Sequence, residues 1–152
     1  MTADQLLIDL GQATGLPGLR LDAAGCARLV FDGHVAVNLE HDPDARAMHL
    51  YTTVGTLPAQ GREALYVELL QANLFGAGTH GATLAVDPAH HEVVLCRTVG
   101  LDDASGPGVL AVVEGFVAAA EEWITRLDAR RAPAPAAEGA PSPRELASFL
   151  RA

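Results

Sequence analysis

The sequence predicts an α+β protein in which helices pack against an antiparallel sheet, in the order α-βββ-α-ββ-α. Three observations lead to this prediction. Stretches of alternating apolar residues follow one another and are joined by short turn sequences, a pattern typical of antiparallel hairpins. Other stretches repeat apolar residues at helical spacing. The chain has 152 residues, of which 49% are hydrophobic, so we expect one domain with its own core.

The first helix is predicted to begin at Thr2. Thr2 and Gln5 have the spacing of a capping box, in which each side chain bonds the backbone of the other residue. Gly15 and Pro17 are expected to end this helix. Its apolar stripe consists of Leu6, Leu7, Leu10 and Ala13.

Three strands are predicted next, over about 27–31, 34–40 and 46–54. The pair Asp32-Gly33 is a strong signal for a two-residue hairpin turn, and Asp42-Pro43-Asp44 is typical of the following turn. Alternation gives each of these strands one mainly apolar face. The residues on these faces are Ala27, Leu29 and Phe31 in the first strand, Val35, Val37 and Leu39 in the second, and Met48, Leu50, Thr52 and Val54 in the third.

A central helix after Gly61 has more apolar surface than one packing partner can cover. A surface helix of a monomer needs an apolar stripe only modestly wider than about 100°. Here the apolar side chains cover well over half of the circumference: Leu65, Tyr66, Val67, Leu69, Leu70, Ala72 and Leu74. The surplus must be buried by more of this chain or by a second copy. We favour a second copy because the chain is small, and therefore predict a homodimer.

The glycines that follow this helix form a G-x-G-x-x-G motif at Gly76, Gly78 and Gly81. In dinucleotide-binding proteins this motif follows a strand and opens a helix, whose N-terminus meets the pyrophosphate. Here it follows a helix, whose C-terminus carries partial negative charge and repels phosphate. We therefore interpret it as a turn in which Gly76 or Gly78 ends the helix in a left-handed conformation.

Two further strands and a long helix complete the predicted domain. The strands span about 82–86 and 93–99, with a hairpin loop over 87–91. Pro107 is well placed near the start of the last helix. The apolar stripe of that helix is Val109, Val113, Phe116, Ala120, Trp123 and Leu127. We expect a domain over 1–131 and a tail over 132–152, with a flexible Ala/Pro-rich linker and a short terminal helix over 142–150.

The sequence contains no convincing catalytic or metal-binding set, so we expect no enzymatic activity, no metal and no cofactor. The adjacent His90 and His91 are a weak metal signal, and Cys26 and Cys96 lack paired-cysteine spacing. The net charge of -9 disfavours nucleic-acid binding. The acidic N-terminus argues against a secretory signal, and no apolar run is long enough for membrane insertion. A cytoplasmic location is expected.

The element order and one stretch resemble a known family. The stretch is Leu69–Phe75 (LLQANLF), followed by the glycine turn and the strand Ala82–Asp87. It is similar to the class I type III secretion chaperones, the Tir-chaperone (CesT-like) family, over roughly residues 2–127. The resemblance implies a bacterial cytoplasmic homodimer without enzymatic activity. Such a protein binds the N-terminal segment of a secreted effector, keeps it competent for secretion and aids its delivery to the secretion apparatus.

The resemblance also implies where the partners bind. The central helix and the strand after it would form the dimer interface, through Leu65, Leu69, Leu70, Leu74, Phe75 and Leu84. The first helix and the sheet would contact the effector segment, through Leu6, Leu10, Leu29, Phe31, Val35, Val37, Leu39, Met48 and Leu50. The alternative is a small ligand-binding or regulatory α+β dimer with no link to secretion. A bound metal or nucleotide at the glycine turn and the histidines would favour that alternative.

Overall fold

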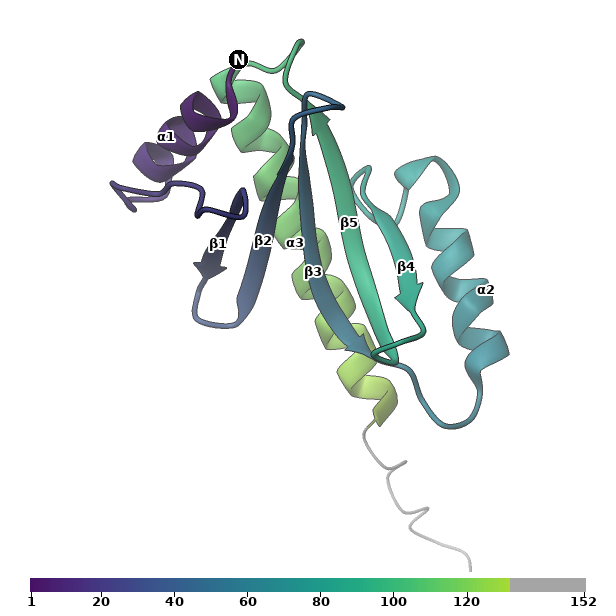
Figure 1. Cartoon of the computed structure of the whole chain (residues 1–152). Coiled ribbons are helices and arrows are strands. Elements are labelled where there is room, and N and C mark those ends of the chain that lie inside the picture. The colour runs from purple at the N-terminus through teal and green to yellow at the C-terminus, as the bar shows by residue number, and fades with distance from the viewer. Residues whose placement is uncertain (132–152) are drawn as a thin grey trace, which may run out of the picture.

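The computed structural model describes residues 1–131, and the predicted element order is confirmed (Figure 1). The tail and the terminal helix predicted for 132–152 lie outside the described residues. The elements are α1 (Ala3–Ala13), β1 (Cys26–Phe31), β2 (Val35–Asp42), β3 (Ala47–Thr56), α2 (Arg62–Asn73), the 3-10 helix η1 (Leu74–Gly76), β4 (Thr83–Asp87), β5 (Glu92–Gly100) and α3 (Gly106–Arg131).

The five strands form one antiparallel sheet in the order β1-β2-β3-β5-β4. The chain leaves the sheet after β3, forms α2 and returns at the edge as β4, so that β5 lies between β3 and β4. The register aligns the apolar residues of neighbouring strands. Leu39 lies opposite Leu50, and Leu95 lies between Thr52 and Leu84. This alignment produces one continuous apolar face.

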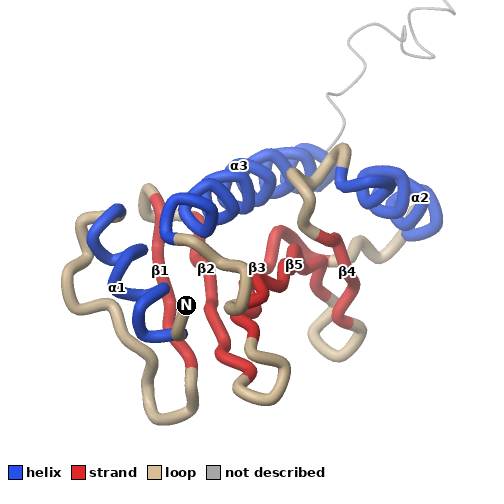
Figure 2. Tube along the Cα trace, turned by 90° about the horizontal axis from the view of Figure 1, so that it is seen from above, coloured by secondary structure: helices blue, strands red, loops and turns tan. Residues whose placement is uncertain are grey.

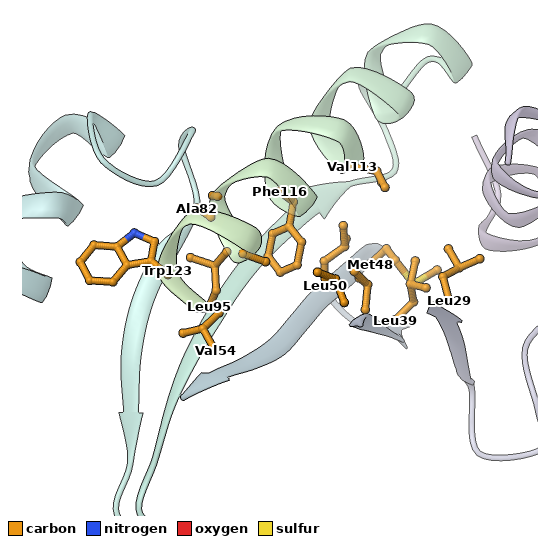
Figure 3. Packing of buried hydrophobic residues seen from close by; sticks show 14 of the residues in the cluster. Leu29, Leu39, Met48, Leu50, Val54, Ala82, Leu95, Val113, Phe116 and Trp123 are labelled. Carbon is orange, nitrogen blue, oxygen red and sulfur yellow. The ribbon is translucent and has the colours of Figure 1, made fainter. Parts of the chain in front are cut away.

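The helices cover that face (Figure 2). α3 crosses the middle of the sheet, α1 packs against α3, and α2 packs beside β4. The predicted stripe of α3 is confirmed, because all six of its residues are buried, with Phe116 and Trp123 the largest (Figure 3). On the opposite face of the sheet, residues such as Thr53, Thr83 and Ala85 are exposed.

Two local predictions need correction. Thr2 caps α1, and its side chain accepts a hydrogen bond from the backbone N–H of Gln5 at 3.2 Å. The Gln5 side chain, however, donates to Asp9 at 2.8 Å, so only half of the predicted capping box forms. At the first hairpin, Asp32 and its following glycine both have positive φ, as the turn signal indicated. The register pairs Phe31 with Val35, so three residues connect the strands instead of two.

A bulge in β3 lets the C-terminal part of α3 lie close to the sheet. The β3–β5 register shifts between Thr53 and Gly55. A Cβ atom on Gly55 would lie 2.8 Å from Cδ1 of Leu127 and 3.0 Å from its Cβ, closer than ordinary van der Waals contact. The absence of a side chain at Gly55 therefore allows the last turns of α3 to pack on β3.

Candidate functional site

The first candidate surface is a groove between α1 and α3, which we call the α1–α3 groove. It consists of two hollows of about 500 and 310 Å³ that share Ala13 and Leu110. The first hollow lies near the N-terminus, and the second reaches the end of β1 at Phe31. The hollows are lined by Met1, Leu6, Asp9, Leu10, Gln12, Ala13, Thr14, Phe31, Asp32, Gly106, Pro107, Val109, Leu110, Val113, Glu114, Val117, Ala118 and Glu121.

The chemistry of this groove follows from the helical period of α3. Leu110 and Val117 are seven residues apart, so they lie on one side of the helix, and both are partly exposed beside the core. Glu114 and Glu121 repeat at the same spacing next to them. Asp9 and Asp32 supply two more carboxylates from α1 and the first hairpin. The groove therefore has apolar walls and an acidic margin, and none of its described lining residues is basic.

The outer edge of β1, beside this groove, is open. The backbone N–H of His41 donates to the carbonyl oxygen of Gly25 at 2.9 Å. Because antiparallel partners alternate, the odd-numbered residues of β1 bond to β2, and Cys26, Arg28 and Val30 direct their backbone groups outward. The backbone N–H and carbonyl of Cys26 already form hydrogen bonds with Asp22. Within residues 1–131, no hydrogen bond outside the sheet involves the backbone of Arg28 or Val30, so both remain available to an added strand.

The second candidate surface lies over α2 and β4, and we call it the α2–β4 surface. Its centre is a hollow of about 390 Å³ lined by Tyr66, Leu69, Leu70, Leu84, Ala85 and Val86. Three of the residues predicted for the dimer interface are buried inside the protomer: Leu65, Leu69 and Leu84. The other three are exposed: Leu70 by 69%, Leu74 by 63% and Phe75 by 98%. Tyr66 and Val67 extend this exposed apolar area.

The outer edge of β4 is closed at Leu84 and at the preceding Ala82, whereas no hydrogen bond outside the sheet in residues 1–131 involves the backbone of Val86. The side-chain amide of Asn73 donates to the carbonyl oxygen of Leu84 at 2.9 Å and accepts from its N–H at 2.8 Å. The Thr79 hydroxyl donates to the carbonyl oxygen of Ala82 at 2.6 Å, and the Ala82 N–H donates to the Thr79 carbonyl at 3.0 Å. Asn73 thus takes the place of a neighbouring strand. A partner at this surface would contact side chains more than it would extend the sheet.

The glycine motif is structural in this fold. The left-handed bend begins at Phe75, with φ of 55°, and continues at Gly76, so it starts one residue earlier than the glycines predict. Left-handed backbone is rare for a bulky residue. Interactions from the core hold the turn, because the Trp123 indole donates to the carbonyl of Gly78 at 2.9 Å and Arg97 donates to that of His80 at 2.7 Å.

The structure shows where the residues predicted to contact the effector lie within the protomer. Eight of the nine side chains are buried in the core of the protomer, two on α1 and six on the sheet beneath the helices: Leu6, Leu10, Leu29, Val35, Val37, Leu39, Met48 and Leu50. Phe31 is partly exposed, and it lines the α1–α3 groove together with Leu6 and Leu10. The alternating pattern identified the buried face of the sheet, which the helices of the same chain cover. Sequence reasoning missed Leu110 and Val117, although both lie beside the stripe of α3.

Outside the two surfaces, the charged groups of residues 1–131 form ion pairs between elements, such as those of Glu68 with Arg126 and Arg130. Within residues 1–131, no group of three or more potential metal ligands is found. His90 bonds Asp87 at 2.7 Å, which raises the pKa of His90 and lowers that of Asp87. Burial raises the pKa of the Cys96 thiol, which makes the reactive thiolate less abundant. None of the helices in residues 1–131 combines the length and hydrophobicity that a membrane span requires.

The fold and its two surfaces define an α+β protein with apolar hollows on either side of α3, and comparison with known proteins places it in a family. The sequence profile of the Tir chaperone protein (CesT) family matches residues 5–124. The chain belongs to this family, and the predicted resemblance is confirmed. A Chlamydia pneumoniae protein, CPj0713/CpB0740, is 31% identical over 110 residues, which cover 72% of this chain and 82% of that protein.

Solved structures share the fold. A chain of the ExsC–ExsE complex has a TM-score of 0.69 and 23% identity, covering 84% of this chain and 97% of that chain. The Yersinia pestis type III secretion chaperone SycH, solved in complex with a stable fragment of YscM2, has a TM-score of 0.65 and 22% identity, covering 80% of this chain and 99% of that chain. At these identities the likeness establishes the shared architecture.

Proposed function

We propose that this protein is a cytoplasmic, homodimeric chaperone that binds the N-terminal segment of a type III secreted effector in an extended form. It would keep that client competent for secretion and aid its delivery to the secretion apparatus. Family membership supports this function, as does the likeness to SycH, a type III secretion chaperone that was solved in complex with a protein fragment. The chaperone itself would carry out no chemical reaction.

The observation that carries the proposal is the continuity of the α1–α3 groove with the open edge of β1. The groove reaches Phe31 at the end of β1, and the backbone of the neighbouring Val30 has no hydrogen bond outside the sheet within residues 1–131. An extended segment can therefore add to the backbone of β1 and place apolar side chains in the groove. Strand addition supplies affinity through main-chain hydrogen bonds, while pockets for side chains supply specificity.

The acidic margin of the groove specifies the chemistry of the client. Asp9, Asp32, Glu114 and Glu121 surround the apolar walls, and the chain carries a net charge of -9. Complementary charge steers association and selects partners. We expect the bound segment to alternate apolar residues with arginine or lysine, and to be unfolded when free, because its backbone must pair with β1.

The α2–β4 surface is the proposed dimer interface. Tyr66 and Leu70 line the hollow beside β4, and Val67, Leu74 and Phe75 are further exposed apolar residues of α2 and η1. Monomers rarely expose large contiguous apolar patches. A twofold dimer needs a self-complementary patch. The exposed Phe75 and the hollow beside β4 would provide the two complementary parts of such a contact.

A pull-down from the native host, with the protein as bait, tests the function directly. We expect one dominant secreted partner, captured through its N-terminal segment. Calorimetry with that segment then compares Glu114→Arg in the groove with Asp128→Arg, an exposed residue of the same helix that does not line it. The groove variant should weaken binding at least tenfold, and the control should not. Equal binding by both variants would place the client elsewhere. A partner that is already folded when free would contradict the chaperone function.

A further inference from the structure

The walls and the margin of the α1–α3 groove suit a segment of this same chain. Residues 132–152 continue directly from α3, and their sequence contains Leu146, Phe149 and Leu150 at the spacing of one helical face. Arg144 and Arg151 flank these apolar residues, and Glu145 lies between Arg144 and Leu146, so residues 143–151 carry one net positive charge. The groove offers partly exposed apolar walls and four carboxylates. The apolar residues of the segment can therefore pack on the walls, and its arginines can pair with the carboxylates.

The length of the tail allows it to reach the groove of its own protomer. Val117 precedes Arg131 by 14 residues along α3 (131 − 117), which corresponds to about 21 Å at 1.5 Å per residue. Leu110 lies 21 residues back, or about 32 Å. Fourteen residues, 132–145, separate Arg131 from Leu146, and they span up to about 46 Å when extended. The tail can therefore run back along α3.

The α2–β4 surface is a poorer match for the same segment. None of the residues lining its hollow is acidic, so Arg144 and Arg151 would find no carboxylate within it. The proposed dimer also covers that surface. The length of the tail permits the α1–α3 groove, and charge favours that groove over the hollow of the α2–β4 surface.

We propose that residues 143–151 bind in the α1–α3 groove of their own chain and compete there with the client. Leu146, Phe149 and Leu150 contact the apolar walls, and the two arginines pair with the acidic margin. The competition rests on the proposed function, whereas the intramolecular contact does not depend on it. The tail thereby shields the apolar groove until a client with higher affinity displaces it.

The expected effect on client binding is modest. A short tether gives a local concentration on the order of millimolar, so a contact with a dissociation constant of about 0.1–1 mM would occupy the groove for half of the time or more. The apparent affinity for client falls in proportion to the open fraction. Disrupting the tail contact should therefore tighten client binding about two- to tenfold.

A spin label on the full-length chain tests the contact without any client. Cys26 and Cys96 are replaced by serine, and Ala152→Cys carries a nitroxide. We expect paramagnetic broadening of the backbone amides of Ala13, Leu110 and Val117. Phe149→Asp should abolish the broadening, whereas Ser148→Asp, which places the same charge away from the apolar face, should preserve it.

The location of the broadening decides the proposal. Broadening centred on the α2–β4 surface, or none, would overturn it. Mixing labelled unenriched chains with isotope-enriched unlabelled chains separates contacts within a chain from contacts between chains, and broadening in the mixed sample alone would refute the intramolecular contact. In the client assay, Phe149→Asp should tighten binding and Ser148→Asp should not. If the contact is observed but no client binds, the contact stands and the proposed function fails.

Discussion

Phe75 gives the most direct test of the proposed dimer. Its side chain is 98% exposed, and its backbone is left-handed, with φ of 55° and ψ of 19°. We choose Phe75→Asn because asparagine tolerates this conformation, so the substitution removes the apolar contact without disturbing the turn. The protomer should therefore keep its stability while self-association weakens.

The magnitude follows from burial and symmetry. Complete burial of a phenylalanine side chain contributes about 1.5–3 kcal/mol. A twofold interface uses each residue twice, so the variant should lose about 3–6 kcal/mol of dimerisation free energy. At 1.4 kcal/mol per factor of ten, the dissociation constant should rise by a factor of about 10² to 10⁴.

Sedimentation equilibrium or light scattering over a micromolar concentration series measures this change. Ile8→Asn is the matched control, because Ile8 is 48% exposed on α1 and lines neither the α1–α3 groove nor the hollow of the α2–β4 surface. The wild-type chain and the control should be dimers at concentrations at which the Phe75→Asn variant is a monomer. A monomeric wild-type chain at micromolar concentration would refute the dimer itself. An unchanged dissociation constant in the variant would show that Phe75 lies outside the interface.

Three further predictions concern the protomer. Gly55→Ala should lower the free energy of unfolding by about 1–3 kcal/mol in urea titrations, because the new Cβ would lie 2.8 Å from Leu127; an unchanged value would mean that α3 shifts freely. Asn73→Ala should cost about 1–3 kcal/mol, since it leaves a backbone N–H and carbonyl of β4 without their partner, and hydrogen exchange in β4 should accelerate. His90 should titrate above its ordinary pKa of about 6.5 in NMR, because it bonds Asp87. Its small stabilising contribution is complete below pH 6.5 and is lost as the pH rises through the raised pKa, and Asp87→Asn should return the titration toward 6.5.

Local patterns in the sequence were sufficient for the elements and for much of the core. The i, i+4, i+7 repeat from Val109 to Leu127 describes the buried stripe of α3, because a helix shows its packed side through its own period. Alternation in β2 and β3 likewise identifies the face that is buried. The motif at Gly76 could be assigned to a turn from the order of the elements alone.

Tertiary structure decided which apolar residues remain available to a partner. The sequence shows that α2 is apolar around most of its circumference, but only packing on β4 separates the buried Leu65 from the exposed Leu70. Except for Phe31, the sheet residues expected to contact the effector are buried beneath the helices. This covering depends on contacts between parts of the chain that are distant in sequence. Periodicity records that a side chain is shielded from water, while the identity of the shielding element depends on how the whole chain folds. For the same reason, the open edge of β1 and the closure of the β4 edge at Leu84 could be found only from the sheet order and from the hydrogen bonds of Asn73.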